Sequence, residues 1–334
     1  MKPFFLICLL LISGLAWGQK KINTQPVTKK PLTPPVYDGW KDIPYKALTP
    51  DGNYAVFTVN PQEGDGKAVF HHIKTNVQDS VKRAAEIALT FDSQYALFKI
   101  KPQQQLVKDL RRQKKKKEDL PKDSLGIYTL TTRKTEKIAQ VKSFKIPEKA
   151  GGWAAWQVEA IQEDKAKPKP DTAKKAEATK PKKVKKNTDE NGYTLVLRNL
   201  NTKQTVQFGF VKEYTFAKFG QGLLFHSTGN DSTLKAGMYW YDLQKEELKQ
   251  LHEGKPKYKY KGLAISEDGT QAAFLLDSDT TKAPNHFYSL YHWKTGDASA
   301  SVLVHDKTQP VPATWFVSEH AAPNFSKDGS QLFF

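Results

Sequence analysis

The sequence LTPDGNYAVF, at Leu48–Phe57, is the first of four similar ten-residue stretches. The others are LTFDSQYALF at Leu89–Phe98, ISEDGTQAAF at Ile265–Phe274 and FSKDGSQLFF at Phe325–Phe334. In each, an apolar residue precedes Ser or Thr, an Asp-Gly or Asp-Ser pair follows, and an apolar run ends on Phe. Asp-Gly favours a tight turn because both residues tolerate positive φ. The flanking stretches are short and rich in β-forming residues, so each copy predicts a β-hairpin.

A second pattern recurs between these hairpins. It consists of an aromatic-rich strand, a polar turn and another strand, at Leu125–Val141, Tyr193–Phe208, Gly237–Leu251 and Phe287–Val304. Apolar and polar residues alternate clearly in Tyr193–Leu200, as they do in a β-strand. One hairpin and one such pair together make four antiparallel strands, which we name A, B, C and D.

Two weaker copies of the hairpin, at Gly151–Ala160 and Gly220–Ser227, use glycine turns in place of Asp-Gly. The A–B turns then fall near residues 51, 92, 151, 221, 268 and 328. This spacing suits four-stranded units of ~40–50 residues, some of them carrying insertions. The sequence therefore predicts an all-β protein, a β-propeller with five complete blades and the opening hairpin of a sixth, incomplete at its C-terminus. Recurrence of one unit favours a propeller over a β-sandwich of meanders, because radial repetition protects strand edges.

Residues 1–18 have the pattern of a cleaved signal peptide. Lys2 precedes the apolar run Phe4–Leu15, and Ala16-Trp17-Gly18 places small residues before a cleavage site at Gln19. The run is shorter than the ~20 residues of a membrane span. We therefore expect a periplasmic or extracellular protein without a membrane anchor. Residues 19–39 are expected to form an extended lead-in, and residues 40–334 the propeller.

The only cysteine, Cys8, lies in the predicted signal peptide. The mature chain is therefore expected to have no disulfide, no thiolate metal site and no cysteine nucleophile.

Two basic insertions interrupt the blades, at residues 101–124 and 162–191. The first has nine Lys and Arg against four acids and the second ten against six, so together they carry about half of the net charge of +17. Both fall between strands B and C, so the Arg111–Lys117 run and the Lys165–Lys186 run should lie on one face. Neither contains the interleaved aromatic residues that single-stranded nucleic acid requires, so no nucleic-acid partner is expected. Electrostatic binding of another polyanion remains a weaker alternative.

Motifs for catalysis or cofactor binding are absent from the sequence. The nearest approach to the serine-hydrolase G-x-S-x-G elbow is Phe225–Gly229, which has Phe in place of the first glycine and continues a predicted strand, so Ser227 is interpreted as structural. His71 and His72 would point to opposite faces of a strand and cannot chelate one ion together. The remaining histidines have no ligand spacing; they are His226, His252, His286, His292, His305 and His320. No catalytic, cofactor-binding or metal-binding residue is assigned.

Trp153 and Trp156 lie three positions apart on a predicted strand. Their side chains are therefore expected to face opposite neighbouring blades and to pack in the cores.

The repeats resemble those of the TolB-like and prolyl-oligopeptidase propellers. A wider set of residues resembles the N-terminal half of exported prolyl-oligopeptidase-family (S9-type) serine peptidases of Bacteroidetes-type bacteria. These residues are a signal peptide, Tyr37-Asp38-Gly39-Trp40, Lys101-Pro102-Gln103, a Lys-rich loop and Leu120–Gly126. The resemblance covers most of the chain.

The resemblance implies that the propeller precedes an α/β-hydrolase domain that carries a Ser, Asp and His triad. The propeller would restrict access so that short peptides reach the site. The expected partners are thus peptide substrates and the protein's own hydrolase domain, which would lie beyond residue 334. These 334 residues alone should be inactive. The alternative is a free-standing periplasmic propeller of the TolB type that acts as a binding or interaction module.

Overall fold

The computed structural model describes residues 32–33, 36–37, 39–159, 185–229, 234–281, 286–309, 312 and 314–334. The predicted signal peptide, most of the lead-in and residues 162–184 of the second insertion lie outside the described residues. The chain divides into two units, Met1–Trp40 and Lys41–Phe334, and every strand and helix given below belongs to the second. Within the described ranges, no helix is both long and apolar enough to cross a membrane.

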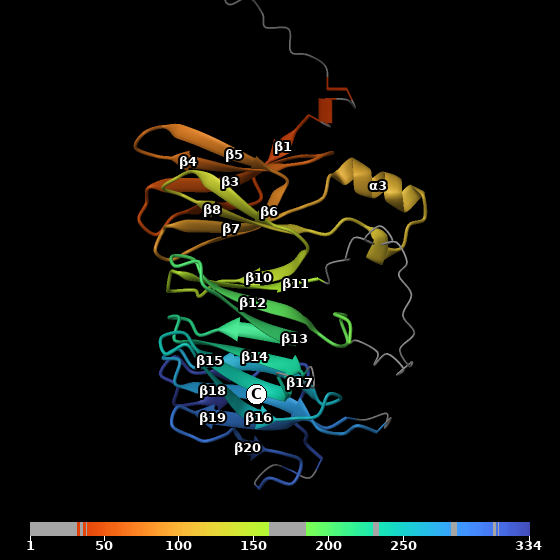
Figure 1. Ribbon diagram of the computed structural model, residues 1–334, viewed down its shortest axis with the longest axis vertical. Coiled ribbons are helices and arrows are strands. Elements are labelled where there is room, and N and C mark those ends of the chain that lie inside the picture. The colour runs from red at the N-terminus through yellow and green to blue at the C-terminus, as the bar shows by residue number, and fades with distance from the viewer. Residues whose placement is uncertain are drawn as a thin grey trace, which may run out of the picture. The chain divides into compact units, whose positions relative to one another are not determined.

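The second unit is a succession of antiparallel sheets in chain order (Figure 1). Blade 1 contains β1 to β5 and blade 2 contains β6 to β9, each strand pairing with its sequence neighbours except that β1 and β2 both pair with β3. The strands of these blades are β1 (Lys41–Asp42), β2 (Lys46–Leu48), β3 (Tyr54–Pro61), β4 (Lys67–His72), β5 (Val77–Lys82), β6 (Ala84–Leu89), β7 (Tyr95–Ile100), β8 (Ser124–Thr129) and β9 (Lys134–Ile138).

Blades 3 and 4 are joined into one seven-stranded sheet by the long strand β13 (Thr205–Phe216). Its first half pairs with β12 as strand D of blade 3, and its second half pairs with β14 as strand A of blade 4. The other strands of this sheet are β10 (Val141–Lys145), β11 (Trp153–Val158), β12 (Tyr193–Asn199), β14 (Gly222–Thr228), β15 (Ala236–Asp242) and β16 (Glu247–Glu253).

Blade 5 again has four strands, and a two-stranded sheet follows it. If β13 is counted twice, and if the short strands β1 and β2, which both pair with β3, are counted as one strand, the described chain contains five four-stranded blades and one further hairpin. This confirms the predicted all-β propeller architecture. The strands are β17 (Lys259–Ile265), β18 (Gln271–Asp277), β19 (Ser289–Lys294), β20 (Ser301–Val304), β21 (Asn324–Phe325) and β22 (Leu332–Phe333).

The Asp of the repeated hairpin has a different role from the one that the sequence suggested. Only the residue after it takes positive φ, as Gly52 (69°) and Gly269 (72°) do, while the Asp side chain closes the turn. In blade 5, Asp268 Oδ1 accepts hydrogen bonds from the Ser266 hydroxyl (2.5 Å) and the Thr270 amide (3.0 Å). The side chain therefore replaces the missing backbone pairing at the strand ends, which explains why Ser or Thr always stands two residues before Asp.

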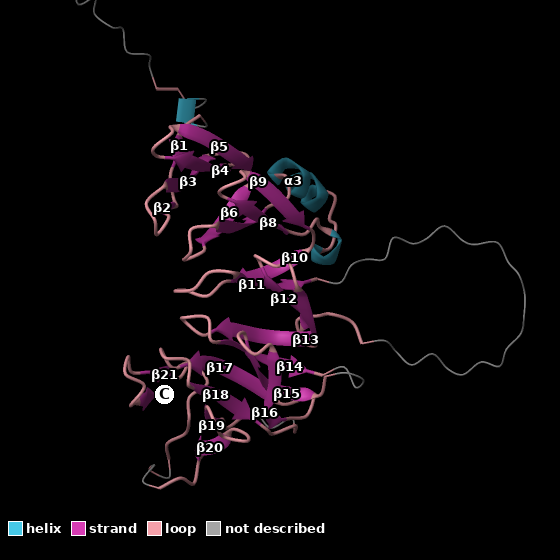
Figure 2. Cartoon of the chain, turned by 60° about the vertical axis from the view of Figure 1, so that its left-hand side comes forward, coloured by secondary structure: helices cyan, strands magenta, loops and turns pink. Residues whose placement is uncertain are grey.

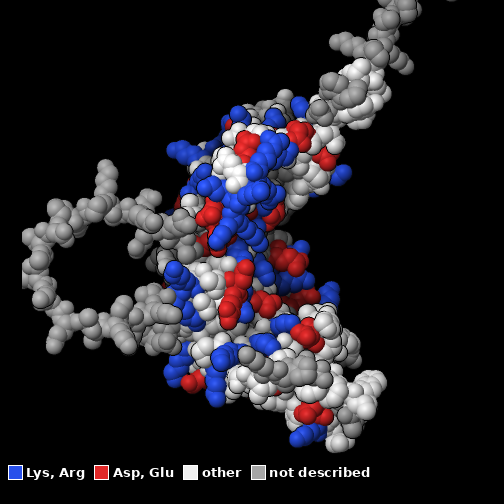
Figure 3. All heavy atoms as spheres, turned by 90° about the vertical axis from the view of Figure 1, so that its right-hand side faces the viewer, with Lys and Arg blue, Asp and Glu red and all other residues white. Residues whose placement is uncertain are grey.

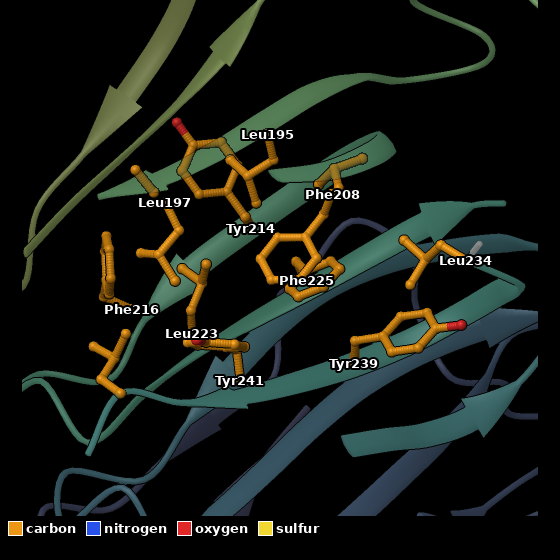
Figure 4. Packing of buried hydrophobic residues seen from close by; sticks show 13 residues of the cluster. Leu195, Leu197, Phe208, Tyr214, Phe216, Leu223, Phe225, Leu234, Tyr239 and Tyr241 are labelled. Carbon is orange, nitrogen blue, oxygen red and sulfur yellow. The ribbon is translucent and has the colours of Figure 1, made fainter. Parts of the chain in front are cut away.

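Hydrophobic clusters fill the spaces between consecutive blades. Leu195 and Leu197 of β12 join the cluster between blades 3 and 4, while Val196 and Leu200 join that between blades 2 and 3. Figure 4 shows the first of these clusters, in which Phe208 and Phe225 lie 4.5 Å apart between ring centroids. Strand alternation in a single blade thus supplies side chains to both neighbouring interfaces.

The A–B turns of neighbouring blades also contact one another. The Lys149 amide donates to the Lys218 carbonyl (2.7 Å) between blades 3 and 4, and Gln221 Nε2 donates to the Asp268 carbonyl (2.9 Å) between blades 4 and 5. At Gly151 the approach to blade 2 is so close that a Cβ atom would lie 2.0 Å from the Asp92 carboxylate. Glycine in this turn therefore allows the turns of blades 2 and 3 to pack closely, because it has no Cβ atom.

The first basic insertion contains helix α3 (Gln104–Arg112) and the 3₁₀ turn η2 (Lys117–Asp119). The sequence interpretation treated this insertion only as a charged loop. It connects β7 to β8, so α3 lies at the end of the strands opposite the A–B turns (Figure 2).

Candidate functional site

The first strands of successive blades converge on a cleft of about 760 Å³. The last strands, such as β5 and β9, are mostly exposed, which identifies them as the outer strands. The walls of the cleft come from β6, β10, β13, β17 and β21, and its mouth from the A–B turns. The lining residues are Glu86, Ile87, Ala88, Phe144, Lys145, Ile146, Glu148, Thr215, Phe216, Lys218, Leu263, Ile265, Glu267, Asn324, Phe325, Ser326 and Lys327. We name this the inner cleft.

The inner strands are irregular where they line this cleft. The pairing register shifts between Ala85 and Ala88 in β6 and between Val211 and Glu213 in β13, and β10 and β17 carry similar shifts. Glu86 at the first shift has a φ of 53°. Such bulges bend a strand and redirect a side chain, and they are common beside functional sites.

Paired charges occupy the mouth and the wall of the inner cleft. Lys218 and Glu267 form an ion pair (2.9 Å) between the turns of blades 4 and 5, and the hydrogen bond from Lys218 to Glu267 raises the pKa of the lysine. The carboxylate of Glu86 forms ion pairs with Lys99 Nζ and Lys101 Nζ, at 2.8 Å each. Partial burial opposes ionisation of Glu86, but these lysines hold its pKa below the usual value.

Lys145 and Glu213 belong to the inner strands of blades 3 and 4. Lys145 Nζ donates to the Tyr214 carbonyl (2.7 Å), and desolvation by the surrounding strands lowers the pKa of this lysine although its side chain stays accessible. Burial likewise raises the pKa of the half-buried Glu213, while Lys145 and Lys261 oppose this shift. The wall thus combines apolar surface with ammonium and carboxylate groups, a composition suited to peptide main chain and polar side chains.

Ser227 lies in the interior of blade 4. It is fully buried, its hydroxyl donates to the Gly209 carbonyl (2.7 Å), and it accepts the Gly229 amide (3.0 Å). Strand β14 continues through it to Thr228, so no strand-to-helix elbow forms at this position. The neighbouring His226 pairs in register with Glu213, and burial lowers the pKa of its imidazole to about 3.

The other residues singled out in the sequence lie apart from one another. His71 and His72 end β4, where Nδ1 of His72 accepts a hydrogen bond from the Thr75 amide (3.2 Å). Among the residues that the structure describes, no group of three or more His, Cys, Asp or Glu side chains is arranged to hold a metal ion. Trp156 packs between blades 2 and 3 and Trp153 between blades 3 and 4, so each contacts a different neighbouring blade, as predicted.

The described parts of the two basic insertions lie on the same face, as predicted. A common cavity of about 790 Å³ is lined by Leu110 and residues 117–122 of the first insertion and by residues 186–189 of the second. An ion pair between Lys122 and Glu159 (3.0 Å) joins the two insertion bases. Residues Lys165 to Val184 of the second run lie outside the described residues.

The sequence did not predict the residues of the inner cleft. Its walls come from the first strands, and β6 and β17 lie almost wholly before the repeated ten-residue stretches. The one local signal is the interruption of the small apolar run Ala84–Leu89 by Glu86. The convergence of Glu86, Lys145 and Lys218 on this cleft depends on the stacking of the blades.

Comparison with known proteins gives no family assignment, since no family model matches the chain. No curated protein matches it either. Solved structures with a similar arrangement include the acylaminoacyl peptidase of Pyrococcus horikoshii, with 9% identity and a TM-score of 0.40 over 80% of this chain and 40% of that chain. The β-propeller domain of the Trilobed protease from Pyrococcus furiosus matches with 9% identity and a TM-score of 0.39 over 78% and 71% of the two chains. A prolyl endopeptidase matches with 12% identity and a TM-score of 0.41 over 79% and 36%.

The chain thus spans less than half the length of the acylaminoacyl peptidase and of the prolyl endopeptidase. At these identities and TM-scores the likeness carries no argument about activity. The fold assignment rests on the strand pairing of the chain itself.

Proposed function

We propose that this chain is the substrate-gating propeller of an exported S9-type serine peptidase that hydrolyses short peptides. In this proposal the hydrolase domain is encoded after residue 334, and the propeller limits which molecules reach it. A propeller is a scaffold for many functions, so the proposal must stand on its residues.

The observation that carries the proposal is the inner cleft. Its volume of about 760 Å³ lies within the ~300–1,000 Å³ usual for small-ligand sites. Such a space suits a short extended peptide and excludes a folded domain. Ion pairs across its turns, such as Lys218–Glu267, hold neighbouring blades together at the mouth.

The residues that resemble the peptidase family give independent support. They are the repeated hairpins together with Tyr37-Asp38-Gly39-Trp40, Lys101-Pro102-Gln103 and Leu120–Gly126. Export is part of this proposal and rests on the signal-peptide pattern of residues 1–18.

The test is to read the gene beyond codon 334 and to assay its full product. We expect further blades, then a strand, a G-x-S-x-G turn and a helix, with Asp and His downstream. The full product should react with a fluorophosphonate probe and cleave chromogenic short peptides, and a Ser→Ala change in the elbow should abolish both. Labelling of residues 19–334 alone, or of the Ser→Ala product, would contradict the proposal.

The competing proposal is a free-standing binding module of the TolB type. The same cleft could then hold a ligand without any chemistry. A stop codon directly after Phe334 would favour this alternative, because the hydrolase elbow would be missing.

A further inference from the structure

A second cleft, of about 710 Å³, lies where α3 meets blades 1 and 2. We name it the α3 cleft. It is lined by the loop that ends β3, by the start of β6 and by one side of α3. The lining residues include Tyr45, Asn60, Arg83, Lys101, Val107 and Arg111.

Polar contacts fix α3 in place over this cleft. The Gly64 amide donates to Gln104 Oε1 (2.8 Å), and the Gln104 amide donates to Asp65 Oδ1 (2.9 Å), which caps the first turn of the helix. Lys108 pairs with Glu63. No residue of α3 is fully buried. The helix is therefore held at its N-terminal half by the loop of blade 1.

Three of the five arginines pair with a carboxylate, and two pair with none in the described part of the chain. Arg112, Arg133 and Arg198 each form an ion pair with a carboxylate. Arg83 and Arg111 form none with any residue that the structure describes, and both line the α3 cleft. These are the five arginines of the sequence. The two guanidinium groups without a carboxylate thus share one concave site.

The other charges of the α3 cleft are already compensated. Lys101 Nζ contacts Glu86 and Asp123 at 2.8 Å each, and Lys108 is paired with Glu63. Of the two lining acids, Asp65 caps α3 and Glu86 holds two lysines. The charge left without a partner in this cleft is therefore the pair of guanidinium groups.

The backbone at Arg83 is fixed on both sides. Arg83 is the single residue between β5 and β6, with a φ of 62°. Its amide donates to the Gly66 carbonyl (2.7 Å), and its carbonyl accepts the Lys101 amide (2.9 Å). Left-handed backbone is uncommon for a residue with a long side chain and is held here by these contacts.

We propose that the α3 cleft binds a carboxylate of an acidic peptide between Arg83 and Arg111. The planar guanidinium group forms paired hydrogen bonds with carboxylates, and two such groups in a half-enclosed site favour a dianionic or diacidic ligand. The amide of Asn60 and the apolar surfaces of Tyr45 and Val107 suit a peptide better than a bare inorganic anion. Lys and Arg residues also gather on the surrounding face (Figure 3), which would attract acidic peptides. The choice of a peptide as ligand rests on the proposed function.

The test is fluorescence anisotropy with the full chain and labelled tetrapeptides. The probes are Ala-Glu-Ala-Glu amide, Ala-Gln-Ala-Gln amide and Ala-Gln-Ala-Gln with a free C-terminus. We expect the Glu peptide to bind at least about tenfold more tightly than the Gln amide, since charged hydrogen bonds are lost with the carboxylates. The third probe shows whether a terminal carboxylate is enough.

Substitutions locate the binding site. R83Q or R111Q should weaken binding of the Glu peptide about tenfold or more, whereas R112Q, on the same helix but outside the cleft lining, should leave it unchanged. R111Q lies at an exposed helix end and spares the sheet, so the test stands even where R83Q unfolds the chain. Equal affinity for the Glu and Gln amides would overturn the proposal. Equal weakening by R112Q and R111Q, or tighter binding of short oligo-dT, would indicate diffuse attraction of polyanions and overturn it too.

This assay needs no hydrolysis, so it is separate from the test of the proposed function. Binding of acidic peptides by a gene product without a hydrolase elbow would leave the α3 cleft assignment intact and reject the peptidase. If the full product hydrolyses peptides but shows no preference for the Glu peptide in the binding assay, the peptidase proposal stands and the α3 cleft assignment is rejected.

Discussion

The guanidinium group of Arg133 binds the carboxylate of Asp79 through two hydrogen bonds, from Nε to Oδ2 (2.5 Å) and from Nη2 to Oδ1 (2.7 Å). Asp79 belongs to β5 of blade 1, and Arg133 precedes β9 of blade 2. The Tyr128 hydroxyl donates to the same carboxylate (2.9 Å). The two outer strands are thus joined by a bidentate pair, although their sheets share no strand.

Asp79→Asn should lower the free energy of unfolding by about 1 kcal/mol, because the carboxylate charge and one of the two oxygens that accept from Arg133 are lost at a partly exposed site. Chemical denaturation followed by circular dichroism would measure this. Asp109→Asn is the matched control, because the Asp109 carboxylate makes only exposed contacts within α3, with Gln105 (2.8 Å) and Arg112 (3.3 Å). It should change the free energy of unfolding by less than about 0.5 kcal/mol. An equal effect of the two substitutions would show that Asp79 does not join the blades.

The aspartates of the A–B turns should contribute stability that depends on acid pH. The Ser266 hydroxyl and the Thr270 amide lower the pKa of Asp268, and similar contacts lower the pKa of Asp328 to about 2. A depressed carboxyl pKa stabilises the fold above the ordinary value of ~3.9, and this stabilisation is lost as the pH falls through the lowered pKa.

Asp268→Ala should therefore destabilise the chain at neutral pH by about 1 kcal/mol, as loss of a side-chain cap does. Asp268→Asn keeps the Oδ1 acceptor but loses the charge, so it should destabilise the chain less than Asp268→Ala at neutral pH. Because asparagine does not titrate, this variant should also lose less stability on acidification. The measurement is the unfolding midpoint across the acid range. Equal losses for Ala and Asn at neutral pH would mean that the charge, and not the acceptor, closes the turn.

His226 should make unfolding easier as the pH falls below neutrality. Burial lowers the pKa of its imidazole to about 3, and its ring stacks against Tyr260 at 4.3 Å. The unfolded chain, with an ordinary value of ~6.5, then binds a proton that the folded chain does not. The free energy of unfolding should fall by up to about 1.4 kcal/mol per pH unit from that value downward.

His226→Phe keeps a ring against Tyr260 and should flatten this dependence. His320→Gln, at an exposed position, should retain the wild-type dependence. Unfolding midpoints in buffers between neutral and mildly acid pH would distinguish them. An unchanged slope in His226→Phe would assign the dependence to other groups.

Bridging the inner cleft should reduce hydrolysis of short peptides by the full gene product. Glu148 and Lys327 are exposed and line the mouth from blade 3 and from the turn after β21. Because Cys8 lies in the predicted signal peptide, a Glu148→Cys, Lys327→Cys double variant has no other thiol within residues 19–334. Cross-linking with a bismaleimide should lower kcat/KM severalfold, because the cross-link would obstruct the entry of the peptide through the mouth of the inner cleft.

The same double variant capped with a monofunctional maleimide is the control and should retain most of its activity. Full activity after complete cross-linking would show that peptides reach the catalytic domain by another route, such as the face that carries α3.

The blade succession could be predicted from the sequence because its causes are local. A turn such as Thr49–Tyr54 is closed by residues within the hairpin, and alternation in Tyr193–Leu200 sorts side chains between two interfaces by strand geometry alone. The residues within each repeat therefore determine its hairpin, and the recurrence of the hairpin predicts the succession of blades.

The candidate sites were decided by the tertiary structure. The shared strand β13, the shift that places Glu86 along the inner cleft, and the docking of α3 on Asp65 all depend on contacts between distant segments. Nothing local marks Arg83 and Arg111 as members of one cleft, since one lies between two strands and the other ends a helix. Their convergence results from the packing of blade 2 against blade 1, because only packing brings side chains from separate segments into one pocket.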